Sequence, residues 1–222
     1  MINNQSIYLN GKPITHMVPD FGMTPNSSED VRKKMGSLVP KNARAINESV
    51  NGDIVIDETD IKEFDIIRGK LTSDGKRVKY AQESDIKVVN TDEEGAIVYT
   101  EVVPAAVLKD TGVPKKENAA QYQQYEFNFV GWGYERIYGK YVHTEEVATI
   151  TGGKITLKYQ LTDKSDVMLL RIGENILSED LFSVTAGSTG GTSEIQISSL
   201  FSTTGKKAKV VYITKLTAVP VE

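Results

Sequence analysis

The chain has 222 residues, enough for one large domain or two smaller ones with a buried core. Its net charge of −4 differs from the basic balance that general nucleic-acid binding requires. Cysteine is absent, which excludes disulfides, thiolate nucleophiles and zinc ribbons, and two histidines are too few for a His-rich metal site. The polar N-terminus and the lack of a long apolar run predict neither a signal peptide nor a membrane span.

The segment 1–50 is predicted to be an extended arm that carries one short helix. A short strand at 7–9 leads into a turn at Asn10–Gly11, after which prolines interrupt regular structure. Residues 28–36 carry a helix signature, with cap residues first, acids in the first turn, bases in the last and a glycine stop. Residues 37–51 show little periodicity, and so long an irregular stretch suits contact with a partner.

Residues 51–145 are predicted to form a β-barrel or sandwich domain, because the hydrophobic period changes to two near Asp53. Strands are expected at 53–57, 64–71, 77–80, 86–89, 96–103 and 125–130. Pro104 is expected to end the fifth of these strands. The polar segment 110–124 is expected to be a loop with one helical turn near 117–121.

Residues 146–222 are predicted to be a separate β-sandwich, divided from the preceding domain by the glycines near residue 152. Strands are expected at 154–161, 167–172, 194–197 and 207–216. A turn is expected at 173–175, a single helical turn at 178–181 and a flexible loop at 187–191. Several short strands with turn residues between them are typical of a sandwich or barrel.

Catalytic and metal-binding patterns are weak throughout the chain. His16 lies in a proline-rich stretch and His143 at the expected domain boundary, and no nucleophile elbow of the form Gly-x-Ser-x-Gly occurs. The acidic turns at 57–60 and 92–94 lack the spacing of a calcium loop. The glycines near Trp132 lack the third glycine of a dinucleotide fingerprint. We therefore expect no enzyme, cofactor or metal, and a hydrolase with an unrecognised acid pair is kept as an alternative.

Aromatic residues gather between positions 122 and 141. The cluster comprises Tyr122, Tyr125, Phe127, Phe129, Trp132, Tyr134, Tyr138 and Tyr141. It has three readings, namely a core strand with a packed turn, a contact surface for another subunit, or a platform on which a sugar ring stacks against Trp132. Under the second reading, the contact residues are Tyr125, Phe127, Trp132 and Tyr134.

The last third of the chain carries a resemblance to a known family. Its pattern comprises Glu146–Thr149, Gly153–Leu157, Asp166–Leu170 and a final Thr204-Gly205 followed by Val210 and Tyr212. This pattern resembles the β-sandwich modules attached to virion proteins of tailed bacteriophages. In those modules, a terminal strand of the form Thr-Gly-x-x-x-x-Val-x-Tyr closes an immunoglobulin-like sheet.

The resemblance implies a non-enzymatic structural subunit of a bacteriophage particle, made in the host cytoplasm and located in the virion. Its partners would be its own copies and neighbouring virion proteins, with no sequence-specific nucleic acid and no membrane. The tail tube is the favoured placement, and capsid decoration or the neck is the alternative. A carbohydrate-binding or adhesion module is the alternative from another class.

The N-terminal arm supplies further predicted contacts under the virion reading. These apolar residues are Met17, Phe21, Met23, Leu38 and Val39. Docking them on a partner would remove apolar area from water at roughly 25 cal/mol per Å², which offsets the entropy lost when the arm becomes ordered.

Overall fold

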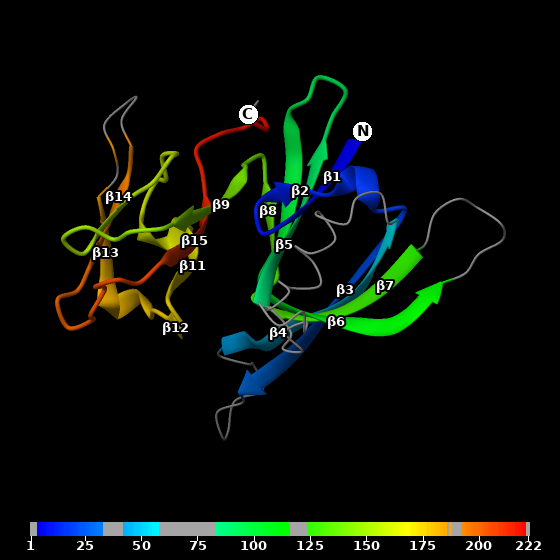
Figure 1. The fold of residues 1–222 in the computed structure, drawn as a ribbon, viewed down its shortest axis with the longest axis horizontal. Coiled ribbons are helices and arrows are strands. Elements are labelled where there is room, and N and C mark those ends of the chain that lie inside the picture. Colours follow the sequence, from blue (N-terminus) through cyan, green and yellow to red (C-terminus); the bar gives the residue numbers. More distant parts are fainter. Residues whose placement is uncertain are drawn as a thin grey trace, which may run out of the picture. The chain divides into compact units, whose positions relative to one another are not determined.

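The computed structural model describes residues 4–32, 42–57, 83–115, 124–185, 187 and 192–220. This part of the chain is mainly β, as predicted, and contains no helix of seven residues or more. The elements in Figure 1 are β1 (Asn4–Leu9), β2 (Lys12–Pro13), η1 (Thr15–Met17), β3 (Asp20–Arg32), β4 (Asn42–Asp57), β5 (Glu83–Thr91), β6 (Ile97–Lys115), β7 (Gln124–Trp132), β8 (Glu135–Tyr138), β9 (Val142–Val147), β10 (Lys154–Thr156), η2 (Lys164–Asp166), β11 (Val167–Ile172), β12 (Asn175–Ile176), η3 (Glu179–Leu181), β13 (Phe182–Thr185), β14 (Glu194–Ile197) and β15 (Ala208–Ile213).

Two compact units divide the chain, and each is discontinuous in sequence. Unit 1 comprises Met1–Pro13, Asp85–Pro104 and Arg136–Glu222, and unit 2 comprises Ile14–Ser84 and Ala105–Glu135. Strand β6 contributes residues to both units. The predicted domains follow chain order, whereas these units interleave distant segments, so the predicted boundaries near residues 50 and 145 stay a prediction.

Unit 1 begins with a short hairpin. Strand β1 pairs with β2 through Tyr8↔Pro13 and Leu9↔Lys12, which leaves Asn10 and Gly11 as a two-residue turn. Both turn residues have positive φ, 50° and 75°, as the turns that match the twist of a hairpin require. The predicted turn at these residues is confirmed. On its other edge β1 pairs with β5 along its whole length.

The C-terminal part of unit 1 contains two antiparallel sheets, ordered β10-β14-β13 and β12-β11-β15-β9. One buried apolar cluster draws alternate side chains from both sheets, as the sandwich prediction requires. Of the predicted strand at 154–161 only β10 forms, but Ile155, Leu157 and Leu161 are all buried. The predicted turn at 173–175 lies between β11 and β12, and the helical turn predicted at 178–181 is η3.

Unit 2 is built on the C-terminal part of β6 and on β7, β4 and β3, in that order. Strand β7 lies between β6 and β4, with Phe129 opposite Leu108 on one side and Gly52 on the other. The side chains of Phe127 and Phe129 are buried on one face, as the alternation predicts. Ile54 and Ile56 of β4 are also buried.

The helix predicted at 28–36 is wrong for the residues that the structure describes. Residues 28–32 belong to β3 and pair with β4 from Ser28↔Ile46 to Arg32↔Asn42. A single short helix is marginal in water, so the backbone ladder to a distant strand outweighs the local cap and charge signals. Residues 33–36 lie outside the described part.

Pro104 does not end its strand, and the loop expected from residue 110 does not begin there, because β6 continues to Lys115. Proline lacks an N–H, but the ladder from β6 to β7 begins at the next residue, in the pair Ala105↔Trp132, so this ladder loses no hydrogen bond. The hairpin predicted at 64–80, the helical turn at 117–121 and most of the loop at 187–191 lie outside the described residues.

Candidate functional site

The described residues offer little for catalysis. Among them, no group of three or more His, Asp or Glu side chains is placed to hold a metal ion. His16 lies in η1 of unit 2, and His143 lies in β9 of unit 1, edge-on to the ring of Tyr159 with 4.7 Å between centroids. The described part of the chain contains no helix long and apolar enough to cross a membrane.

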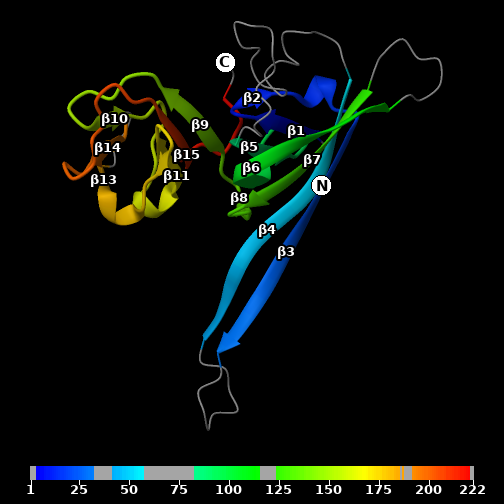
Figure 2. The ribbon, with the colours of Figure 1, turned by 60° about the horizontal axis from the view of Figure 1, so that its bottom comes forward.

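The ribbon formed by β3 and β4 is the most extended feature of unit 2 (Figure 2). Strand β4 pairs with β7 only over Ser49–Asp57, whereas it pairs with β3 as far as Asn42. Between Ser28–Arg32 and Asn42–Ile46, the described strands pair only with each other. At ~3.3 Å per residue, the two-stranded end of the ribbon is about 15 Å long.

The end of this ribbon has the properties of a docking element. An isolated pair of strands is marginally stable in water, and each outer edge presents backbone N–H and C=O groups that a further strand can pair with. A neighbouring chain that adds a strand or a surface would satisfy these groups and order the ribbon. The geometry therefore suits assembly.

The predicted contact residues fall into three classes. Met17 and Phe127 are each 1% exposed, so their side chains belong to the core of this chain. Phe21 and Met23 are half-buried on β3, where Phe21 stacks on Phe129 with ring centroids 6.1 Å apart, and Tyr134 is also half-buried. Trp132 is exposed, at 52%. Tyr125 lies in β7, and Leu38 and Val39 lie outside the described residues.

The aromatic cluster therefore divides between core and surface. Phe127, Phe129 and Tyr141 are buried, whereas Trp132 and Tyr138 are exposed. Trp132 and Val130 alternate with Phe129 along β7, and both are exposed on the face opposite the buried phenylalanines. Extending the predicted strand from Val130 to Trp132 would have placed Trp132 on this face from the sequence alone. A contact role for Trp132 stays a prediction.

A buried polar network in unit 1 was not predicted from the sequence. Asp85 of β5 is fully buried, and its Oδ1 lies 2.5 Å from Nζ of Lys209 on β15. The same ammonium donates a hydrogen bond of 2.7 Å to Oδ1 of Asn10, and the Thr144 hydroxyl donates one of 2.7 Å to Asp85 Oδ2. The network joins the β1–β2 turn, β5, β9 and β15.

A second buried cation, Lys87, lies two residues further along β5. Its Nζ donates hydrogen bonds to the carbonyl of Val142 at 2.6 Å and to the hydroxyl of Tyr141 at 3.0 Å. The ammonium also lies 4.4 Å and 4.1 Å from the ring centroids of Tyr8 and Tyr141. These partners compensate the loss of water around the charge. The Lys87 network lines no described cavity, whereas Lys209 of the Asp85 network also lines a cavity on the C-terminal sandwich.

Tyr212 illustrates how burial controls a titrating group in the sandwich. Burial raises the pKa of the Tyr212 hydroxyl far above its ordinary value, and the nearby Glu145 carboxylate acts in the same direction. The hydroxyl donates to Glu145 Oε2 at 3.1 Å and accepts a hydrogen bond from the N–H of Tyr159. The phenol therefore remains a neutral donor and holds these segments together.

Asp163 shows the opposite shift, and it supplies a test. Hydrogen bonds from the hydroxyl and N–H of Ser165, at 2.5 Å and 2.8 Å, lower the pKa of Asp163. When folding lowers the pKa of a carboxyl group, it adds stability at pH values above the group's ordinary pKa. That stability is lost as the pH falls through the pKa that the group has in the folded protein. We expect Ser165→Ala to raise the pKa of Asp163 toward 3.8, its ordinary value, measured by NMR titration of the side-chain carboxyl. An unchanged Asp163 titration would contradict this account.

Comparisons with known proteins give the following. No protein-family model matches the chain, and no curated protein sequence matches it. Among solved structures, the chain is similar to one from the sheath–tube complex of an extracellular contractile injection system, PVC, in the extended state. The identity is 12% and the TM-score 0.37, over 61% of this chain and 88% of that chain.

Two further similarities concern proteins at the ends of such tubes. One is to the PVC sheath/tube terminator, with 12% identity and a TM-score of 0.38, over 61% of this chain and 94% of that one. The other is to the tube-terminating cap of the anti-feeding prophage, with 12% identity and a TM-score of 0.37, over 62% and 91%. With TM-scores this low, a function has to be argued from this chain's own geometry.

Proposed function

We propose that this chain is a non-enzymatic structural subunit of a virion or virion-like tail, made in the host cytoplasm. It assembles with its own copies and with neighbouring particle proteins. The tail tube is the favoured place, and the alternatives are the neck or decoration of the capsid. The observation that carries the proposal is the β3–β4 ribbon, which runs beyond the sheet that supports it.

The ribbon supports assembly for an energetic reason. A chain that acts alone would gain nothing from a strand pair whose outer edges are left to water, because such a pair is marginally stable and invites pairing with other chains. In a subunit, the same edges become the contact. The exposed apolar pair Val130 and Trp132 on β7 supplies a second surface of the type found at interface centres.

The ribbon is tested by shortening it. Replacing residues 28–47 with Asn-Gly keeps the ladder between β4 and β7, which begins at Ser49. We expect the unaltered chain to form rings, tubes or concentration-dependent polymers in size-exclusion chromatography and negative-stain microscopy. We expect the shortened variant to remain monomeric and to keep a circular dichroism spectrum of the β type. An unaltered chain that is monomeric at every concentration would contradict the proposal, as would a shortened variant that assembles normally.

Trp132→Ala tests the second surface. We expect weaker assembly with a free energy of unfolding of the monomer changed by no more than about 0.5 kcal/mol, because the side chain is exposed. Leu200→Ala is the matched control, since Leu200 is also a large exposed apolar residue but lies in unit 1, after β14. Assembly is measured by analytical ultracentrifugation. Equal losses in the two variants would show that general surface apolarity, and not Trp132, is responsible.

The adhesion alternative is addressed by the same Trp132 variant. A sugar-stacking role predicts that the unaltered chain binds neutral glycans and that the variant loses this binding. The structural proposal predicts no such binding in either protein. A glycan array read with both proteins separates the two functions.

A further inference from the structure

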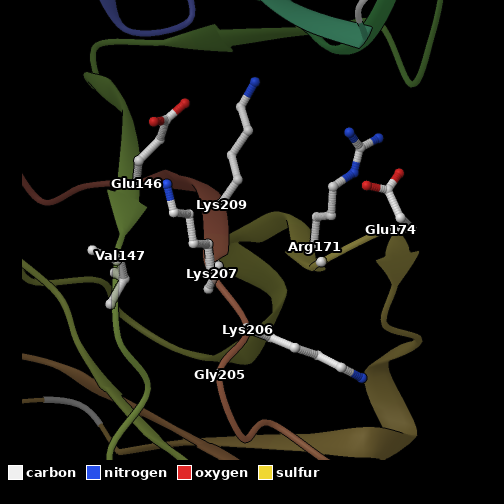
Figure 3. A pocket seen from close by; sticks show the side chains of 11 residues that line it. Glu146, Val147, Arg171, Glu174, Gly205, Lys206, Lys207 and Lys209 are labelled. Carbon is white, nitrogen blue, oxygen red and sulfur yellow. The ribbon is translucent and has the colours of Figure 1, made fainter.

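The C-terminal sandwich carries a charged cavity on one sheet, shown in Figure 3. It has a volume of about 510 Å³, and it lies over the ends of β9, β11 and β15 and the loops that follow β11 and precede β15. Cavities of several hundred cubic ångströms are the size that small ligands occupy. None of the candidate catalytic, metal-binding or contact residues of the sequence analysis lines it.

Strand register explains why charges gather there. Arg171 on β11 pairs with Lys209 on β15, and Lys209 pairs with Glu146 on β9. Directly opposed residues of neighbouring strands project from the same face, so the three side chains form a row. Lys207 projects from that face too, two residues before Lys209, and Glu174 follows β11 beside Arg171 (Figure 3).

The positive charges of the cavity differ in how they are engaged. Lys209 is neutralised by Asp85. Lys206 points away from the row, with its ammonium 4.5 Å from the ring centroid of Phe201. Among the described residues, no hydrogen bond, ion pair or ring engages the ammonium of Lys207, which is exposed at the cavity. Lys207 is therefore the cation that is available to a ligand, and it lies beside Glu146 (Figure 3).

The carboxylates decide which kind of anion fits. Glu146 and Glu174 lie on either side of the cations, so a continuous phosphate chain such as a nucleic acid would be repelled at both ends. A ligand with one acidic group and several hydroxyls suits this arrangement. Its acid would pair with Lys207, and its hydroxyls would donate to the two carboxylates.

We propose that this cavity binds a sugar carrying a single acidic group, either a carboxylate or a phosphate. No aromatic side chain is among the described residues that line the cavity, so recognition is by charge and hydrogen bonds, and a neutral sugar has no platform on which to stack. The site lies in unit 1, and it is independent of the ribbon and of Trp132. It adds a ligand-binding activity to the proposed structural role.

The test is a ¹H–¹⁵N NMR titration of the full chain, shortened at the ribbon if the unaltered chain polymerises. The probes are galacturonate, galactose 6-phosphate, neutral galactose and inorganic phosphate at equal millimolar concentrations. We expect one or both acidic sugars to shift the amide signals of Gly173 and Lys207, and galactose to shift neither. Which acidic sugar binds identifies the acid as carboxylate or phosphate, and either result supports the site.

Lys207→Gln is expected to weaken the binding of the acidic sugar about tenfold, the loss of one charge-assisted contact. Lys154→Gln is the matched control, because Lys154 is an exposed lysine of the other sheet of the sandwich, paired with Glu194. The proposal would be overturned if galactose or inorganic phosphate bound as well as the acidic sugars, or if the amide signals of Gly173 and Lys207 did not shift. It would also be overturned if Lys207→Gln and Lys154→Gln bound the acidic sugar with equal affinity. A protein that fails to assemble yet binds the acidic sugar would refute the proposed structural role and leave this site standing.

Discussion

Asp85→Ala is expected to lower the free energy of unfolding of unit 1 by about 3 kcal/mol, because it leaves the ammonium of Lys209 without its anion. We take the lower end of the usual range since the Lys209 side chain is 13% exposed and can still recruit some water. The Thr144 hydroxyl also loses its acceptor. Urea denaturation followed by circular dichroism measures the change.

A double variant shows whether the stability lost in Asp85→Ala comes from a buried charge without a partner or from the loss of a favourable contact. Removing both charges in Asp85→Leu with Lys209→Met is expected to recover much of the loss, because neither ion then has to be buried. The exposed pair Lys154 and Glu194, 3.6 Å apart, is the control, and Lys154→Met is expected to cost no more than about 0.5 kcal/mol. A loss for Asp85→Ala as small as that of the control would contradict the account.

Gly52→Ala is expected to destabilise unit 2 by about 3 kcal/mol, although it adds only one methyl group. A Cβ at Gly52 would collide with the carbonyl oxygen of Gly22 and with the ring of Phe129. The first neighbour is backbone and the second is a buried ring stacked on Phe21, so neither can give way cheaply. Hydrogen exchange of the β4 amides and urea denaturation measure the effect.

The neighbouring Asn51→Ala is the control for Gly52→Ala, because Asn51 is exposed on the same strand. It is expected to change stability by no more than about 0.5 kcal/mol. Adding Phe129→Leu to Gly52→Ala removes the ring collision but leaves the collision with the Gly22 carbonyl. We therefore expect the double variant to lose less stability than the sum of the two single variants, but to remain less stable than the original protein. Tolerance of Gly52→Ala would mean that β3 and β4 are further apart than described.

The parts of the fold that were predictable are those whose signal is local. Alternation puts Phe127 and Phe129 on one face of their strand, but it left open whether that face is core or contact surface, and the structure shows both buried. The Asn10–Gly11 pair predicted its turn. The helix predicted at 28–36 fails in β3, because its caps and charges are also local while the competing ladder to β4 is not.

The buried charges could not be read from the sequence for the same reason. Asp85 and Lys87 look like the polar face of an ordinary strand, yet β5 is buried on both faces from Ser84 to Asn90. Their partners, such as Lys209 and Tyr141, lie far away along the chain. The contact residues divide in a similar way, because only the structure separates the buried Met17 from the exposed Trp132.

The hydrogen bond between Asn10 and Lys209 joins residues 199 positions apart. During synthesis, β9 and β11 lack the strand that lies between them until β15 has left the ribosome. Only then can the ammonium of Lys209 reach Asn10 in the β1–β2 turn. The β3–β4 ribbon, by contrast, leaves the ribosome early. A translation product that stops short of β15 would therefore carry the β3–β4 ribbon beside a unit 1 that lacks this strand. Unit 1 therefore closes only after β15 has been made.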